Sequence, residues 1–215
     1  MVHYKLTYFD GRGAAEIIRQ SPELTNHSSV FVLAGQDFED VRLTQEEWPK
    51  HKAEMPFGQV PVLEVDGQQL AQSFAIVRFL SRKFGFAGKT PFEEALVDSI
   101  ADQWKDFMKE IQPMVKVALG FEEGDLDKLT KEIFLPARDK FFGYMTKFLK
   151  KNKSGYLVGD SLTFADLYLA EYFSEFAKKI PGLFDGFPEM KAHAEKVRSN
   201  PILKKWIETR PQTKF

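Results

Sequence analysis

The chain contains no cysteine among its 215 residues. This absence excludes disulfide bonds, thiolate metal ligands and a cysteine nucleophile within the protein. The four histidines, His3, His27, His51 and His193, also lack the spacing of a metal site. We therefore expect no bound metal.

Long apolar runs and an excess of positive charge are missing as well. The net charge is -1 and the isoelectric point is about 6.5, so the chain lacks the basic surface that nucleic-acid binding requires. No apolar run approaches the roughly 20 residues of a membrane span, and residues 1–9 are too short and polar for a signal peptide. We expect no nucleic-acid partner, no membrane partner and a cytoplasmic location.

What the chain contains falls into two regimes. Residues 1–84 mix short strand-like and helical segments, which is typical of an α/β domain. Residues 85–91 carry glycine and proline and form the only plausible linker. Residues 92–215 are helical throughout, with apolar residues at helical spacing over 96–111 and 126–148 and with Pro136 as a predicted kink. An all-α domain therefore follows the α/β domain.

Residues 57–73 are the most informative stretch. Pro61 heads an apolar run, where it marks a strand start or an exposed edge, and Asp66-Gly67 is a hairpin signal. Gln72-Ser73 precedes a helical apolar series. Because the first amide N–H groups of a helix lack intrahelical partners, a carboxylate would bind well at Ser73.

The first predicted strand, His3 to Phe9, carries a tyrosine near its end. The Tyr8 hydroxyl, beside the start of a helix, can donate a hydrogen bond to an anion. Taken alone, a tyrosine in the position of Tyr8 is more often a packed core residue than a catalytic one.

Together, these features resemble the cytosolic glutathione transferases over nearly the whole chain. The first strand, residues 4–9, and the closing segment, residues 206–213, are most similar to the sigma-type enzymes, which include nematode transferases and haematopoietic prostaglandin D synthase. The resemblance implies a thioredoxin-like N-terminal domain, an all-helical C-terminal domain for substrate binding and dimerisation, and a homodimer. It also implies a cis peptide bond before Pro61.

The resemblance also assigns roles to individual residues. Tyr8 would be the catalytic hydroxyl, and glutathione would be a co-substrate, with no separate cofactor. Asp106, and less surely Asp102, would reach the γ-glutamyl amine from the partner subunit. Trp48 and Lys52 would contact the glycine end of glutathione. Its main chain would bind Gly58, Gln59 and Val60, and its γ-glutamyl carboxylate would bind Gln72 and Ser73.

A chain without a thiol needs the reactive sulfur to come from its ligand. The glutathione thiol, like free cysteine, is mostly protonated at neutral pH. A hydrogen bond from Tyr8 to the charged form would stabilise the thiolate by roughly 1.5 to 3 kcal/mol. The implied reaction is attack of this thiolate on a small hydrophobic electrophile.

Three departures separate the chain from its relatives. Ala14 and Pro113 stand where the prostaglandin synthase has an arginine near the sulfur and a tryptophan in the substrate cleft, which puts isomerisation in doubt. Residues 21–29 interrupt the first helix of the α/β domain as a nine-residue insert. If the helix continued through the insert, its second half would rotate by about 180°, so we expect this polar segment to loop out.

Two other classes of function remain open beside the enzyme. One is a non-catalytic carrier of haem-like or other large apolar anions. The other is a structural protein, like those found in eye lenses, that resembles these enzymes but has lost their activity. Tyr8 together with the Gln72-Ser73 pair favours catalysis over both.

Overall fold

The computed structural model describes residues 2–10, 15 and 29–209. The chain divides into two compact units, residues 1–87 with 198–215 and residues 88–197. This division differs from the predicted domains at the C-terminus, because helix α10 (Pro201–Thr209) packs on α1 (Ser29–Ala34) in the first unit. The predicted loop at residues 21–29 lies outside the described residues, apart from Ser29, which begins α1.

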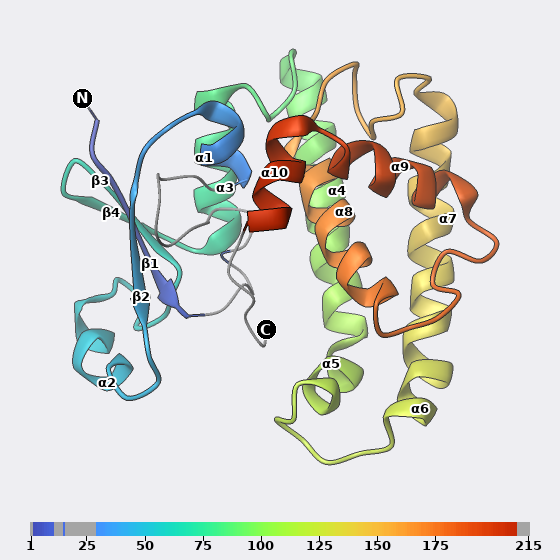
Figure 1. Ribbon diagram of the computed structural model, residues 1–215, viewed down its shortest axis with the longest axis horizontal. Coiled ribbons are helices and arrows are strands. Elements are labelled where there is room, and N and C mark those ends of the chain that lie inside the picture. The colour runs from blue at the N-terminus through green and yellow to red at the C-terminus, as the bar shows by residue number, and fades with distance from the viewer. Residues whose placement is uncertain (1, 11–14, 16–28, 210–215) are drawn as a thin grey trace. The chain divides into compact units, whose positions relative to one another are not determined.

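The first unit contains a four-stranded mixed sheet in the order β2-β1-β3-β4 (Figure 1). Strand β1 (Tyr4–Phe9) runs parallel to β2 (Glu39–Leu43) and antiparallel to β3 (Val62–Val65), which pairs with β4 (Gln68–Ala71). The predicted hairpin is confirmed. Its turn residues Asp66 and Gly67 have φ of 48° and 84°, as a two-residue turn of type I′ requires.

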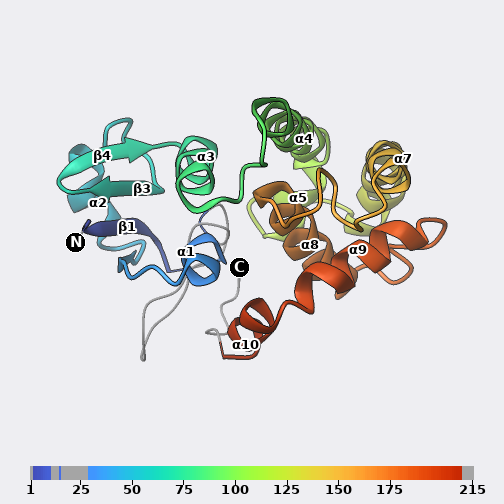
Figure 2. The same cartoon turned by 90° about the horizontal axis from the view of Figure 1, so that it is seen from above.

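Helices α1 and α3 (Ser73–Phe84) cover one face of this sheet, as Figure 2 shows. The ring of Tyr4 on β1 fills the space between them, with centroids 5.2 Å from Phe31 and 6.1 Å from Phe84. Side chains at alternate positions of a strand share a face, so Leu6 and Tyr8 point to the same side as Tyr4. This arrangement confirms the α/β class of the N-terminal part.

The second unit is helical in all of its regular elements that the structure describes. These are α4 (Pro91–Glu110), α5 (Gln112–Ala118), α6 (Leu126–Leu129), a π-helical turn η3 (Thr130–Phe134), α7 (Leu135–Lys151), α8 (Phe164–Ala177) and α9 (Pro188–Arg198). The ring of Trp104 contacts the rings of Phe107, Phe141 and Phe173 at 5.3 to 5.9 Å. Burial of these large aromatic rings makes the main hydrophobic contribution to this core.

The predicted kink at Pro136 takes the form of the π-helical turn. Proline has no N–H to donate to the carbonyl four residues back, so the backbone must adjust ahead of it. The N–H of Leu135 donates to the carbonyl of Thr130, five residues earlier. The helix thereby continues from residue 126 to residue 151 without a break.

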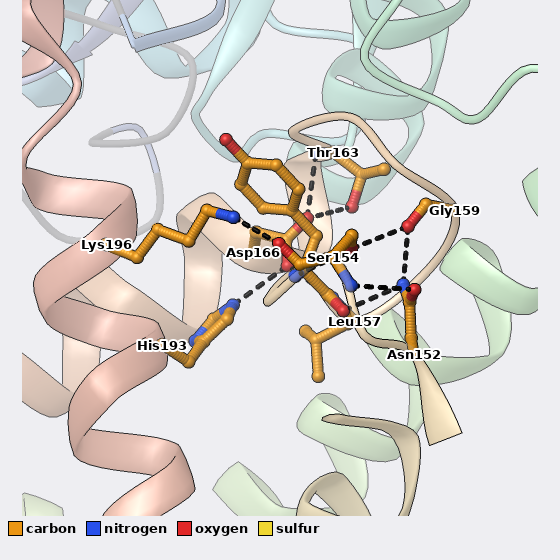
Figure 3. A network of polar contacts seen from close by, with 9 residues as sticks. Asn152, Ser154, Leu157, Gly159, Thr163, Asp166, His193 and Lys196 are labelled. Atoms are coloured by element: carbon orange, nitrogen blue, oxygen red, sulfur yellow. Dashed lines mark hydrogen bonds and ion pairs between the residues drawn. The ribbon is translucent and has the colours of Figure 1, made fainter. Parts of the chain in front are cut away.

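Asp166 connects the loop before α8 to helix α9 (Figure 3). Its Oδ2 accepts hydrogen bonds from the backbone N–H of Thr163 at 2.8 Å and from the Thr163 hydroxyl at 2.7 Å. Its Oδ1 accepts from the backbone N–H of Leu157 at 2.9 Å and lies 2.8 Å from Nε2 of His193. The predicted capping box at Thr163 and Asp166 is confirmed, and its carboxylate is fully buried.

Two negative findings concern the part of the chain that the structure describes. None of its helices is long and apolar enough to cross a membrane. No group of three or more histidine, cysteine, aspartate or glutamate side chains is placed to hold a metal ion within these ranges.

Candidate functional site

Three strand ends meet beside Tyr8. The last pairs of the sheet at this edge are Thr7 with Val62 and Val62 with Ala71. The next residue along each strand is Tyr8 on β1, Pro61 before β3 and Gln72 after β4. The register therefore gathers the tyrosine, the proline and the start of α3 at one edge of the sheet.

The peptide bond between Val60 and Pro61 is cis, as the resemblance implied. Pro61 is buried, whereas Val60 is half-buried and Gln59 is exposed. Pro61 has no N–H to pair with a neighbouring strand, so regular pairing ends here. The backbone at Gln59 and Val60 thus borders the sheet edge, next to the end of β1.

Gln72 and Ser73 form the junction between β4 and α3. Gln72 has φ 75° and ψ 115°, a conformation that a non-glycine residue adopts only at a cost of about 1 to 3 kcal/mol. The carbonyl of Gln72 accepts the first helical hydrogen bond, from the N–H of Ile76 at 3.0 Å. The amide N–H groups of the first turn, starting at Ser73, therefore have no intrahelical acceptor and present partial positive charge.

Trp48 lies near the same edge of the sheet, because its ring contacts the ring of Phe9. The ring centroids of Phe9 and Trp48 are 5.3 Å apart at 71°, and Phe9 contacts Tyr8 edge-on at 5.7 Å. Trp48 begins α2 (Trp48–His51) and is half-buried. Three aromatic side chains thus run from the end of β1 to the start of α2.

Lys52 and Gly58 lie against one another. Lys52 begins the short 3-10 helix η2 (Lys52–Glu54), and its aliphatic stem would lie 3.6 Å from a Cβ placed on Gly58. Gly58 has φ +58°, and its N–H donates to the carbonyl of Met55 at 3.0 Å. This turn brings the Lys52 stem back toward the strand that begins after Pro61.

A capping box that the sequence analysis missed holds the turn before Trp48. The backbone N–H and the hydroxyl of Thr44 both donate to Oε2 of Glu47 at 2.9 Å, and the N–H of Glu47 donates to the Thr44 hydroxyl at 3.2 Å. The hydrogen bond from the Thr44 backbone is the main cause that holds the pKa of Glu47 below its ordinary value. The pattern Thr-x-x-Glu before Trp48 is the signal that would have found this box.

A second missed cluster surrounds Arg42 on β2. Its Nη1 donates to Asp10 and its Nε to Asp40, both at 2.9 Å. Burial alone would lower the pKa of Arg42, but attraction by Asp40 and the hydrogen bonds to Asp10 and Asp40 outweigh it, so the pKa is raised. No local pattern points to this cluster, because Asp10 is 32 residues away in the sequence.

Asp102 and Asp106 lie one turn apart on α4, in the second unit. Both side chains are exposed, and Asp102 forms an ion pair with Lys105 at 3.6 Å. Their spacing of four residues places them on the same face of the helix. The structure brings eight predicted residues together in the first unit and holds these two on a separate helix.

The first unit therefore combines four chemical features at one edge of its sheet. They are a tyrosine hydroxyl, the backbone at Gln59 and Val60, the amide groups at the start of α3, and the side chains of Trp48 and Lys52 one helical turn apart. An extended peptide with an anionic end at each terminus matches these features in sign and in kind.

Known proteins share both halves of the chain. Residues 5–82 match the glutathione S-transferase N-terminal domain, and residues 105–210 match the glutathione S-transferase C-terminal domain. The probable glutathione S-transferase 8 of Caenorhabditis elegans is 54% identical, with the whole of each chain covered.

Solved structures agree with these matches. Monomeric Na-GST-3, a glutathione S-transferase from the hookworm Necator americanus, is 75% identical over 99% of this chain and 100% of its own, with a TM-score of 0.94. A Nu-class glutathione S-transferase from Haemonchus contortus is 70% identical over the whole of both chains, with a TM-score of 0.89. The chain belongs to the glutathione S-transferase family.

Proposed function

We propose that this glutathione S-transferase conjugates the glutathione thiolate to small hydrophobic electrophiles, and that Tyr8 stabilises the thiolate. The observation that carries the proposal is the meeting of Tyr8, the cis Val60–Pro61 bond and the Gln72–Ser73 junction at one sheet edge. A cytosolic location, a sigma-type class and a part in detoxification belong to the same proposal.

Glutathione binds in this proposal as an extended peptide along the sheet edge. Its main chain pairs with the backbone at Gly58, Gln59 and Val60, and its γ-glutamyl carboxylate accepts hydrogen bonds at Gln72 and Ser73. The first turn of a helix supports this role, because its amide groups and its dipole both favour an anion. The glycine carboxylate lies against Trp48 and Lys52, where one cation balances its charge.

The Tyr8 hydroxyl then donates one charge-assisted hydrogen bond to the sulfur. Such a bond contributes roughly 1.5 to 3 kcal/mol, which corresponds to about one to two pH units in the ionisation of the thiol. Since the ordinary thiol pKa is about 8.5, this contribution makes the thiolate the main form, or nearly so, near neutral pH. The chain itself has no cysteine, so glutathione supplies the nucleophile.

Asp106, and less directly Asp102, bind the γ-glutamyl amine of glutathione held by a second subunit. Their exposure on α4 supports a role toward a partner. A homodimer with two equivalent sites follows from this assignment. The similar hookworm enzyme is described as monomeric, so light scattering at assay concentration is the deciding measurement, and an active monomer would overturn the shared site.

A conjugation assay with a small aryl halide tests the main proposal. The native chain should be retained on immobilised glutathione and should turn over the halide. Tyr8→Phe should be retained equally well but should conjugate about tenfold to a hundredfold more slowly, because one charge-assisted hydrogen bond is lost. Retention of the native chain without turnover would instead support a non-catalytic carrier.

A further inference from the structure

Arg42 stands directly beside Tyr8 in the sheet. The two residues are partners in the parallel register of β1 and β2. Partners in neighbouring strands are about 4.8 Å apart, and their side chains point to the same face. Arg42 is thus the nearest charged residue of the neighbouring strand to the proposed catalytic tyrosine.

Two carboxylates share this face with Tyr8. Asp10 follows Tyr8 by two residues, and Asp40 precedes Arg42 by two residues, so alternation places all four side chains on one side of the strands. The backbone supports this placement, since the N–H of Asp10 continues the ladder to the carbonyl of Leu43 at 3.1 Å. The Arg42 guanidinium bridges Asp10 and Asp40 at 2.9 Å each.

The exposure of these groups determines how strongly they act. The side chains of Arg42 and Asp40 are 18% and 8% exposed, whereas that of Asp10 is 59% exposed. Taken by themselves, Asp10, Asp40 and Arg42 carry two negative charges and one positive charge, which sum to -1 over these three side chains. A unit charge close to a half-solvated site changes an ionisation equilibrium by about threefold, and bulk water and salt reduce this effect.

An anion must form on this side of the sheet if Tyr8 stabilises a thiolate. Nearby carboxylates disfavour a second negative charge, and a nearby guanidinium favours it. We propose that Arg42 is a positioning residue that holds and neutralises Asp10 and Asp40 beside Tyr8, so that the glutathione thiolate can form there. This inference rests on the proposed function of Tyr8.

Other charges on these strands lie elsewhere. Lys5 pairs in register with Glu39 on β2 and with Glu64 on β3, so these three side chains occupy the opposite face. His3 lies 3.7 Å from Glu39, at the far end of β1 from Tyr8. Lys5 therefore offers a matched control, because its removal changes the net charge of the same strands by the same amount.

The test has two parts. The thiol of bound glutathione is titrated by its ultraviolet absorbance, and kcat/KM for the electrophile is measured across pH with glutathione saturating. Arg42→Gln leaves a net charge of -2 on these side chains, so it should raise the pKa of the bound thiol by about half a pH unit and lower kcat/KM at neutral pH by about 1.5- to 3-fold. The loss should shrink in high salt and at alkaline pH. Lys5→Gln should leave the titration unchanged.

The charge can be restored without restoring Arg42. The double variant Arg42→Gln with Asp10→Asn has the native net charge of -1 and should recover most of the lost activity. Asp10→Asn alone has a net charge of zero and should lower the midpoint of thiol ionisation by about half a pH unit, which raises the ionised fraction at neutral pH by at most about twofold. This single variant keeps the inference testable if Arg42→Gln does not fold.

Several results would overturn the inference. They are a folded Arg42→Gln variant with an unchanged thiol titration, a double variant as impaired as Arg42→Gln, or a loss of ionisation in Asp10→Asn. The role of Tyr8 is judged separately, by Tyr8→Phe in the native background. An unchanged titration in Tyr8→Phe would remove the proposed function, whereas a normal Tyr8→Phe effect with no Arg42 effect would remove only this inference.

Discussion

Asp166 is expected to be the most costly single side chain to remove from the second unit. Its carboxylate accepts four hydrogen bonds in a fully buried position, from Thr163, Leu157 and His193. Asp166→Ala leaves those donors without their acceptor. Each stranded donor costs about 1 kcal/mol or more, and partial relaxation of the loop brings the total to roughly 3 to 6 kcal/mol. This loss is comparable with the whole stability of many domains, about 5 to 15 kcal/mol.

Urea unfolding followed by circular dichroism measures this loss. Asp166→Asn should fall between the native chain and Asp166→Ala, because its amide oxygen still accepts while its NH₂ group faces other donors. Asp160→Ala is a matched control, because its exposed carboxylate forms an ion pair with the exposed Lys89, and such surface pairs contribute little. A loss below about 1 kcal/mol in Asp166→Ala would refute the network as a main source of stability.

Three further predictions concern the site and its supports. Asp106→Ala should raise the KM for glutathione severalfold without changing the unfolding midpoint. Asp127→Ala, an exposed control on α6, should change neither quantity. Equal KM values in the two variants would contradict the role of Asp106. The pKa of Glu47 is lowered in the folded state, so its ionised carboxylate stabilises the fold at pH values above the ordinary pKa of 4.5. This stabilisation is lost as the pH falls through the folded-state pKa. The difference in melting temperature between the native chain and Glu47→Gln should therefore disappear at acid pH. A difference that does not depend on pH would contradict this role of Glu47. Deletion of residues 21–29 should raise the melting temperature, since this polar segment offers little apolar surface to bury; a lower melting temperature would show that the segment packs on the fold.

Local signals were sufficient to predict much of the fold. Asp66-Gly67 gave the hairpin, Ser73 the start of α3, and Thr163 with Asp166 the capping box of α8. Each of these rests on a few neighbouring residues with defined turn or capping chemistry. The helices of the second unit followed from the period of their apolar residues.

Contacts between distant segments could not be predicted in the same way. Arg42 meets Asp10 only after β1 and β2 have paired, and α10 joins the first unit although the helices before it belong to the second. The predicted first long helix ends at Ile111, within one residue of the end of α4, but the short helix α5 that follows it, with Pro113 at its second position, was not predicted. Proline fits the first turn of a helix, so the same residue is compatible with a new start as well as with a kink.

Stabilisation of the glutathione thiolate by the Tyr8 hydroxyl can be measured by titrating bound glutathione in the native chain and in Tyr8→Phe. The midpoint of thiolate formation should rise by about one to two pH units in Tyr8→Phe, while the affinity for glutathione changes little. An identical midpoint in the two proteins would contradict this stabilisation.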